Sequence, residues 1–334
     1  MTRADKPTFT VIIPVHNGGE KFTRCMEALA ACAPAPDEII VVADGESDGS
    51  WRTAERFGAR IVRMEVSGGP ARARNAGARV ARGELLLFID ADVVVPGDIL
   101  AVAARAFEAD PGIAAVFGSY DDAPLEANFL SQYKNLAHYH VHQSSHAEAS
   151  TFWSGCGAIR RELFLGIGGF DERYRLPSIE DIELGYRITA AGHRIRLVKE
   201  LAVKHLKRWD AVSLVKTDFL CRALPWTELI LRRGRFINDL NLTTESRISV
   251  AATGLLALCL AAAPFWPALL ALALAPCGLL LALNRDLYRF FLRKKGALFT
   301  AQAIPWHWLY FGYSGLAFSI GFVRYHAQRL RKRG

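Results

Sequence analysis

The chain contains 334 residues, a length that accommodates one sizeable α/β domain and a smaller appendage. Its hydrophobic fraction of 51% is high for a wholly soluble enzyme, and the apolar residues concentrate after Arg247, which indicates contact with a membrane. The net charge of +8 comes largely from residues 285–295 and 324–333, beside apolar stretches, so anionic lipid explains it better than nucleic acid, which we exclude as a partner. The six cysteines form no CxxC pair, which argues against a zinc site or a disulfide framework.

The first half of the chain alternates short apolar runs with helix-like stretches. No apolar signal region precedes the first run, which predicts that the first domain stays in the cytoplasm. Runs that are apolar throughout suit strands buried on both faces of a mainly parallel sheet, and their alternation with helices predicts a doubly wound, Rossmann-like α/β domain. Strands are expected at residues 11–15, 38–42, 60–64, 85–89 and 114–117, and helices at 20–31, 50–57, 71–81 and 97–109.

Polar clusters follow three of these strands, at residues 16–19, 44–48 and 90–92. In open α/β sheets, ligands bind in the crevice beyond the carboxyl ends of the strands. The sequence therefore predicts one nucleotide-sized site that collects all three clusters.

Asp90 and Asp92 emerge together at the end of the strand at 85–89. Paired carboxylates suit Mg²⁺ or Mn²⁺, which would neutralise a diphosphate; the alternative is that they are turn or helix-cap residues. Upstream, the glycine-rich loop at 68–70 leads into a helix that carries Arg72, which either faces phosphate oxygens or is simply solvated.

Two further carboxylates are candidates for the site. Asp44 follows the second strand and can accept hydrogen bonds from a base or ribose, although capping of its own turn competes with that role. Asp181, next to Glu180 at the start of a helix-like run, is a candidate general base, although acidic residues also favour a helix's first turn on electrostatic grounds alone.

The last third of the chain holds two long stretches without Asp, Glu, Lys or Arg. Residues 248–283 would be about 54 Å long as one helix, so we expect a hairpin of two spans that turns near Pro264 and Pro267. Residues 296–323 are long enough to cross again, yet a third span would put the basic tail outside, against the positive-inside rule. Two or three spans therefore stay open, and a buried helical core in a soluble protein is the alternative.

Several motifs, in this order and spacing, resemble those of glycosyltransferase family 2, the inverting group of GT-A fold that acts on nucleotide-activated sugars. The resemblance covers about residues 8–207 and implies a GT-A catalytic domain at 1–207, which we expect to be followed by an amphipathic interfacial segment at 208–247, a transmembrane region at 248–323 and a basic tail at 324–334. The motifs are VIIPVHN at 11–17, ADGESDGS at 43–50, ARNAG at 73–77, FIDAD at 88–92, GGFDE at 168–172 and Glu180-Asp181.

The resemblance also implies roles for individual residues. Asp181 would be the catalytic base, and Asp90, Asp92 and His205 would hold Mg²⁺ or Mn²⁺ and the diphosphate. The alternative for His205 is a structural role, as for many single histidines. The donor, a UDP-sugar by preference or a GDP-sugar, would be bound by Pro14, His16, Asn17, Asp44, Arg72 and Asp90. The acceptor region would include Trp153, Gly155 and Glu180.

The chain departs from the family pattern in two places. Ala43 stands where a first acidic residue is common, which leaves the nucleoside contact to Asp44 alone. The Q/RxxRW motif of processive synthases is absent, and residues 221–226 read CRALPW, which favours transfer of a single sugar.

The sequence thus predicts a multi-pass protein of the inner membrane, with a cytoplasmic catalytic domain that glycosylates a lipid-linked or cell-envelope glycan acceptor. The rivals are a non-catalytic membrane scaffold and a sugar-nucleotide pyrophosphorylase. The latter should carry a glycine-rich loop with Arg and Lys after its first strand, where this chain offers only His16, Gly18, Gly19 and Lys21.

Overall fold

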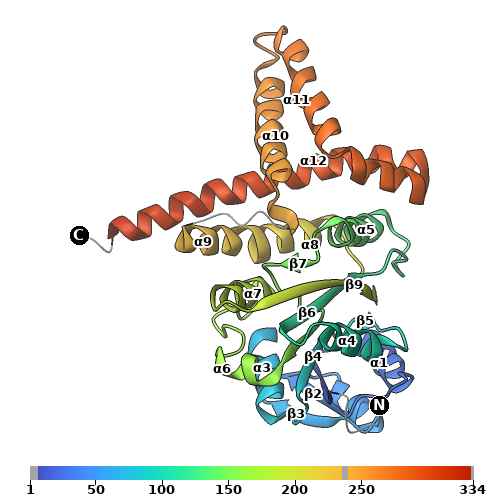
Figure 1. The fold of residues 1–334 in the computed structure, drawn as a ribbon. Helices are drawn as coiled ribbons and strands as arrows, with labels where there is room; N and C mark the ends of the chain where they lie inside the picture. Colours follow the sequence, from blue (N-terminus) through green and yellow to red (C-terminus); the bar gives the residue numbers. More distant parts are fainter. Residues whose placement is uncertain (1–6, 235–239, 332–334) are drawn as a thin grey trace. The chain divides into compact units, whose positions relative to one another are not determined.

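The computed structural model describes residues 7–234 and 240–331 (Figure 1). Two compact units make up the chain. The sheet unit is formed by residues up to 127 together with 142–208, and the helical unit by residues 128–141 together with those from 209 onward. Residues 235–239 of the predicted amphipathic segment and 332–334 of the predicted basic tail lie outside the described residues.

The first four long strands of the sheet unit are parallel and lie in the order β3-β2-β1-β4. Helices connect them, as the alternation of apolar runs predicted. The strands are β1 (Phe9–Val15), β2 (Glu38–Asp44), β3 (Arg60–Met64) and β4 (Leu85–Ile89), and the helices that join them and lead on from β4 are α1 (Gly19–Ala30), α2 (Ser50–Arg56), α3 (Pro70–Val80) and α4 (Ile99–Ala109).

The sheet then changes character. β4 pairs antiparallel with β8 and β8 with β6, whereas β6 and β9 run parallel. The sheet is therefore mixed. The sequence predicted a mainly parallel sheet, and the uninterrupted parallel part comprises β3, β2, β1 and β4. The remaining elements of the unit are β5 (Val93–Val94), β6 (Ile113–Tyr120), β7 (Glu148–Ala149), β8 (Cys156–Arg160), α6 (Arg161–Gly166), α7 (Glu180–Ala190) and β9 (Arg194–His205).

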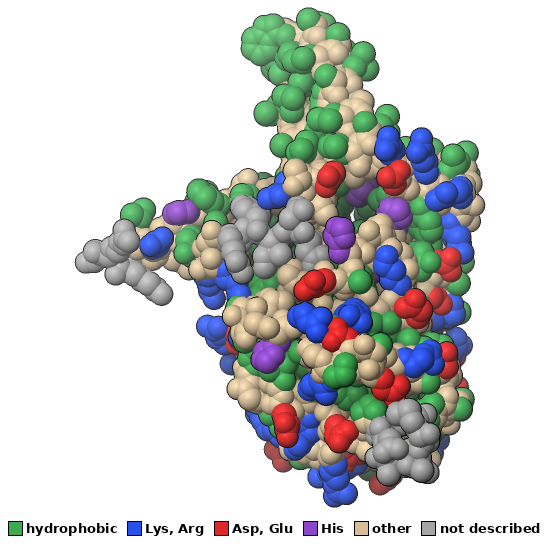
Figure 2. Space-filling model, viewed as in Figure 1, with side chains coloured by type: hydrophobic (Ala, Val, Ile, Leu, Met, Phe, Trp, Pro, Cys, Tyr) green, Lys and Arg blue, Asp and Glu red, His purple; other side chains and the backbone are tan. Residues whose placement is uncertain are grey.

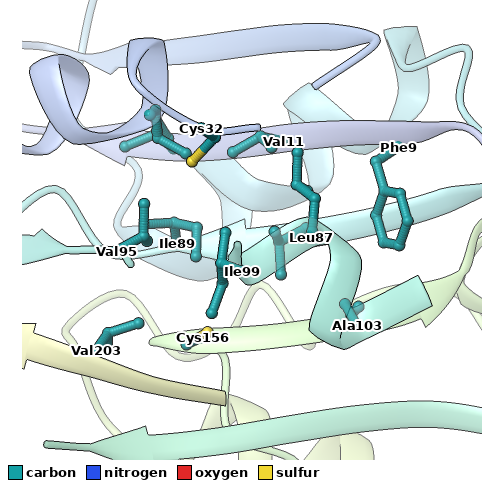
Figure 3. Close-up of a cluster of buried hydrophobic side chains, with 14 of the residues drawn as sticks. Phe9, Val11, Cys32, Leu87, Ile89, Val95, Ile99, Ala103, Cys156 and Val203 are labelled. Carbon is teal, nitrogen blue, oxygen red and sulfur yellow. The ribbon is translucent and has the colours of Figure 1, made fainter. Parts of the chain in front are cut away.

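A cluster of buried hydrophobic side chains packs the strands of the sheet against α4 (Figure 3). Val11 and Leu87 are fully buried on adjacent strands, and Ile99 of α4 packs against the same layer. On the other face, α3 lies so close to the sheet that a Cβ at Gly77 would come within 2.7 Å of Ile12 Cγ2. Burial on both faces explains why the strands read as continuous apolar runs.

The helical unit is built from α5 (Phe129–Ser144), whose last turn belongs to the sheet unit, α8 (Ala211–Lys216), a π-helix (Thr217–Ala223), α9 (Leu224–Arg233), α10 (Thr244–Ala262), α11 (Leu269–Leu283) and α12 (Arg285–Arg331). α10 and α11 pack against each other through Ala252, Leu256 and Ala273. The turn between them contains Pro264 and Pro267, where the sequence predicted it.

Among the described residues, one helix, α10, is long and apolar enough to cross a membrane on its own. α11 passes the same test only together with α12, from which it is bent by 67°. The predicted third stretch, 296–323, lies inside α12, whose helical geometry is interrupted at Gly296 (φ 82°). A multi-pass arrangement stays a prediction.

Candidate active site

Arg74 links two of the predicted motifs. Its Nη2 lies 2.6 Å from Asp90 Oδ1 at the end of β4, and its Nη1 lies 3.0 Å from Glu180 Oε1 at the start of α7. The Arg74 side chain is only 5% exposed, and its Nε is buried without a hydrogen-bond partner. A single buried guanidinium therefore holds the end of β4 and the first turn of α7 together.

The sequence favoured Arg72 over Arg74 for a phosphate contact, but Arg72 is exposed, whereas Arg74 is buried. The spacing of the residues in this helix could have identified Arg74 as buried. Ala71, Arg74, Asn75 and Ala78 are buried and follow the i, i+3, i+4, i+7 spacing of one helix face, so helical periodicity alone places Arg74 on the inner face of α3.

Asp181 lies beside this ion pair, in the first turn of α7. Its Oδ2 accepts from the Ser154 backbone N–H at 3.2 Å, and its Oδ1 from the Ile182 N–H at 2.8 Å. Burial first, and the neighbouring Glu180 carboxylate second, raise the pKa of Asp181 to about 7, although Arg74 opposes the shift. A carboxyl with this pKa can take up a proton near neutral pH, as a general base must.

The pairing of β5 with β9 brings Asp92 and His205 close together. β5 pairs with β9 so that Val93 lies opposite His205, and His205 Nε2 comes to 3.6 Å from Asp92 Oδ2. Burial alone would raise the pKa of Asp92, but the nearby His205 imidazole, with the charges of Lys207 and Lys21, holds it below its ordinary value. Asp92 is therefore an ionised, partly exposed carboxylate.

An aromatic ring fixes the orientation of His205. The Tyr120 ring stacks on the imidazole with a centroid distance of 4.1 Å and an interplanar angle of 10°, and its hydroxyl lies 3.3 Å from Nε2. Trp153, predicted for the acceptor region, packs edge-on against Tyr120 at 4.9 Å. A Cβ at Gly155, the neighbouring prediction, would run into the Trp153 ring, so the two residues lie in close contact.

The residues of this region fit a divalent cation that is shared with a diphosphate. Within 7–234 and 240–331, no three His, Cys, Asp or Glu side chains already converge as a metal site. Asp92 and His205 offer an oxygen and a nitrogen ligand, while Asp90 is engaged by Arg74. Mg²⁺ commonly takes one or two protein carboxylates and completes its shell with substrate phosphates and water, which this donor set allows.

Asp44, at the end of β2, is hydrogen-bonded to the loop that follows β3. Its carboxylate accepts from the Ser67 hydroxyl at 2.9 Å, the Gly68 N–H at 2.7 Å and the Gly69 N–H at 3.0 Å. These contacts hold the loop at 67–69, which lies 23 to 25 positions along the chain and not in the turn after β2, and the nucleoside contact of Asp44 stays a prediction. The loop it holds is tight, because a Cβ at Gly69 (φ 85°) would run into the Arg175 carbonyl oxygen.

The remaining predicted donor residues line the neighbouring strand end. His16 Nδ1 lies 2.7 Å from the Asp44 carbonyl oxygen, and Asn17 Oδ1 accepts from the Ser47 N–H at 2.8 Å. Pro14 lies in β1, opposite Val42 of β2. The loops after β1 and β2 are therefore cross-linked by polar contacts. Glu180, predicted for the acceptor region, is instead buried and paired with Arg74.

Comparisons with known proteins find glycosyltransferases. Residues 10–168 match the model of glycosyl transferase family 2, and residues 135–209 match that of the N-terminal domain of galactosyltransferase. The glycosyltransferase GlyG of Streptococcus pneumoniae serotype 4 is 31% identical over 96 residues, 27% of this chain and 32% of that protein. The pre-mycofactocin glycosyltransferase of Mycobacterium tuberculosis is 28% identical over 234 residues, 65% of this chain and 44% of that protein.

Among solved structures, the mannosyltransferase PcManGT from Pyrobaculum calidifontis, in complex with GDP-Man and Mn²⁺, superposes with a TM-score of 0.59 at 21% identity. The superposition covers 89% of this chain and 86% of that one. At this identity the likeness establishes a shared fold. The curated relatives are matched over less of their own length, about a third of GlyG and less than half of the pre-mycofactocin enzyme.

Proposed function

We propose that this chain, whose residues 10–168 belong to glycosyltransferase family 2, transfers a single sugar from a nucleoside-diphosphate donor to an acceptor, with inversion at the anomeric carbon. The observation that carries this proposal is the Arg74 bridge. It ties the DxD segment, where a metal-bound diphosphate would sit, to the helix turn that presents Asp181.

In the proposed reaction, the oxygen of the acceptor attacks the anomeric carbon while the bond from that carbon to the diphosphate oxygen breaks in line. Asp181 takes the proton of an acceptor hydroxyl, and the nucleoside diphosphate leaves with the electron pair of the broken bond. Asp92 and His205 would hold the Mg²⁺ or Mn²⁺ that neutralises the leaving charge. The remaining rate enhancement would come from positioning of donor and acceptor.

The donor is proposed to be a UDP- or GDP-sugar. The loops after β1 and β2, with His16, Asn17 and Asp44, supply polar groups for the nucleoside, and the structurally similar PcManGT was solved with GDP-Man. Transfer of a single sugar rests on CRALPW at 221–226, which replaces the motif of processive synthases.

The acceptor is proposed to be lipid-linked or an envelope glycan, reached by an enzyme that is anchored in the inner membrane with its sheet unit in the cytoplasm. Support comes from α10, with the length and composition of a span, and from the exposed apolar surface of the hairpin that it forms with α11 (Figure 2). Anchoring in the membrane would favour such substrates over soluble ones.

A thermal-shift panel tests the donor site. UDP, GDP, dTDP and CDP are added to the detergent-solubilised protein with and without Mn²⁺, using wild type, Asp92→Ala and the control Glu108→Gln on the exposed face of α4. We expect metal-dependent stabilisation by one nucleotide, lost in Asp92→Ala and retained in the control. Absence of any shift would reject the catalytic proposal in favour of a non-catalytic membrane scaffold.

A further inference from the structure

α12 carries an apolar stripe on its exposed side. Leu298 is 76% exposed, Leu309 47%, Leu316 56% and Val323 65%. Their spacings of 11, 7 and 7 residues place all four on one face of an α-helix. Between 296 and 323 the sequence contains no Asp, Glu, Lys or Arg, so no charge interrupts this stripe.

The opposite face of α12 packs inside the helical unit. Ala303, Phe311 and Ala317 are buried, and Gly321 approaches α9 so closely that a Cβ there would lie 2.7 Å from Thr227 Cγ2. α9 itself bears the exposed ion pair between Arg232 and Glu228, at 3.3 Å. A helix that is charged in this way belongs in water or among headgroups, because charges within the hydrocarbon core are costly. α12 therefore cannot cross the bilayer alongside α9.

The hairpin of α10 and α11, in contrast to α9, exposes apolar side chains. Leu258 is 70% exposed, Leu274 71% and Phe265, in the turn, 77%. The 19 residues of α10 measure about 28 Å, close to the hydrocarbon thickness of about 30 Å. The axis of α12 is bent by 67° from that of α11. From Gly296 to its end α12 is about 50 Å long, whereas a span requires about 30 Å.

Basic residues stand at both ends of the stripe. Arg289, Arg293, Lys294 and Lys295 precede it, and Arg324 and Arg329 follow it. A span would put these two groups on opposite sides of the membrane, against the positive-inside rule, whereas a helix lying in the plane puts both at the headgroups of one leaflet.

We infer that α12 lies in the plane of the bilayer at the base of the hairpin, with Leu298, Leu309, Leu316 and Val323 facing the acyl chains and the flanking arginines and lysines binding anionic headgroups. The chain then has no third span. The inference rests on the proposed membrane anchoring. It adds that the apolar face of α12 determines how deeply the helical unit enters the bilayer.

Depth measurement by spin labelling tests this surface. Single cysteines replace Leu298, Leu309, Leu316 and Val323, and separately Phe265 as the reference for the hairpin tip, in full-length protein whose six native cysteines are replaced. Each variant is reconstituted into phosphatidylcholine vesicles with and without phosphatidylglycerol, and the accessibility of each label to oxygen and to a water-soluble nickel complex is recorded.

We expect the four α12 labels to share one shallow depth just below the headgroups, and the Phe265 label to lie in the hydrocarbon or at the far interface. A gradient, with labels 309 and 316 deep and 298 and 323 near opposite surfaces, would overturn the in-plane assignment while leaving the anchoring intact. If the Phe265 label were also in water, the anchoring itself would fail. Label-to-label contact between two copies, without lipid contact, would assign the stripe to self-association instead.

Discussion

Arg74 and Glu180, 106 positions apart in the sequence, form a buried ion pair with 3.0 Å between Nη1 and Oε1. Each side chain is only 5% exposed. The same guanidinium also reaches Asp90, so one cation faces two carboxylates, with Asp181 beside them. Such an arrangement couples the stability of the site to the protonation of its base.

Replacing Arg74 by Gln should therefore strongly lower both the stability of the fold and the turnover. Glu180 would be left as an unpaired buried carboxylate, and breaking a buried pair from one side costs about 3–5 kcal/mol. We expect a strongly lowered midpoint of thermal unfolding and loss of turnover. Arg72→Gln is the matched control for stability, because Arg72 is exposed on the same helix and its change should cost less than about 0.5 kcal/mol. Equal effects of the two substitutions would contradict the assigned role.

The pH profile should report Asp181. Since its pKa is raised to about 7, the carboxylate that accepts the proton is depleted below neutral pH. For an acceptor with a hydroxyl nucleophile, kcat/KM should fall about tenfold per pH unit well below pH 7, and Asp181→Asn should remove both the activity and this limb. An Asp181→Asn enzyme with near-native turnover would refute the base, or would identify an acceptor phosphate that is already ionised.

The same shift has a consequence for stability. The folded protein holds the proton of Asp181 up to about pH 7, whereas the unfolded chain releases it near the ordinary value of 3.8. Between these values the folded state binds more protons, so this group's contribution to stability declines as the pH rises. Asp181→Asn should therefore raise the unfolding midpoint relative to wild type at pH 8 and have little effect at pH 4. A lower midpoint at pH 8 would contradict the assigned pKa.

The sequence predicted the helix and strand alternation of residues 9–109 because those strands are buried on both faces and read as apolar runs. It could not predict that β8 enters between β4 and β6 with reversed direction, because strand pairing is set by contacts between distant segments. Asp90, Asp92 and Asp181 were predicted as site residues from their places at a strand end and a helix start. Helical periodicity could have placed Arg74 on the inner face of α3, but its pairing with Asp90 and Glu180 required the three-dimensional structure. The same holds for the stacking of Tyr120 on His205.

Tyr120 should control metal affinity without being a ligand. Its ring stacks on His205 and its hydroxyl approaches Nε2, so Tyr120→Leu frees the imidazole to rotate away from Asp92. Residues that orient a ligand typically change metal affinity by about 10–100-fold. We expect a weaker Mn²⁺ affinity of that order in the presence of the nucleotide, measured by calorimetry. Tyr133→Leu, in the helical unit, is the control and should leave the affinity unchanged.

Asp44 supplies a test that separates loop organisation from donor binding. Its carboxylate satisfies two backbone N–H groups and a hydroxyl in residues 67–69, so Asp44→Ala leaves buried donors unpaired, at about 1–3 kcal/mol in all. Ser67→Ala removes only the hydroxyl contact and is the milder comparison.

If Asp44 acts through the loop alone, the loss of nucleotide affinity should follow the loss of stability across Asp44→Ala and Ser67→Ala. If its carboxylate also accepts from the base, Asp44→Ala should weaken the preferred nucleotide more than the others in the thermal-shift panel, because only a base with a matching N–H loses a partner. Uniform weakening of all four nucleotides would assign Asp44 to the loop and leave base recognition to the neighbouring His16 and Asn17, whose polar atoms face the same strand end.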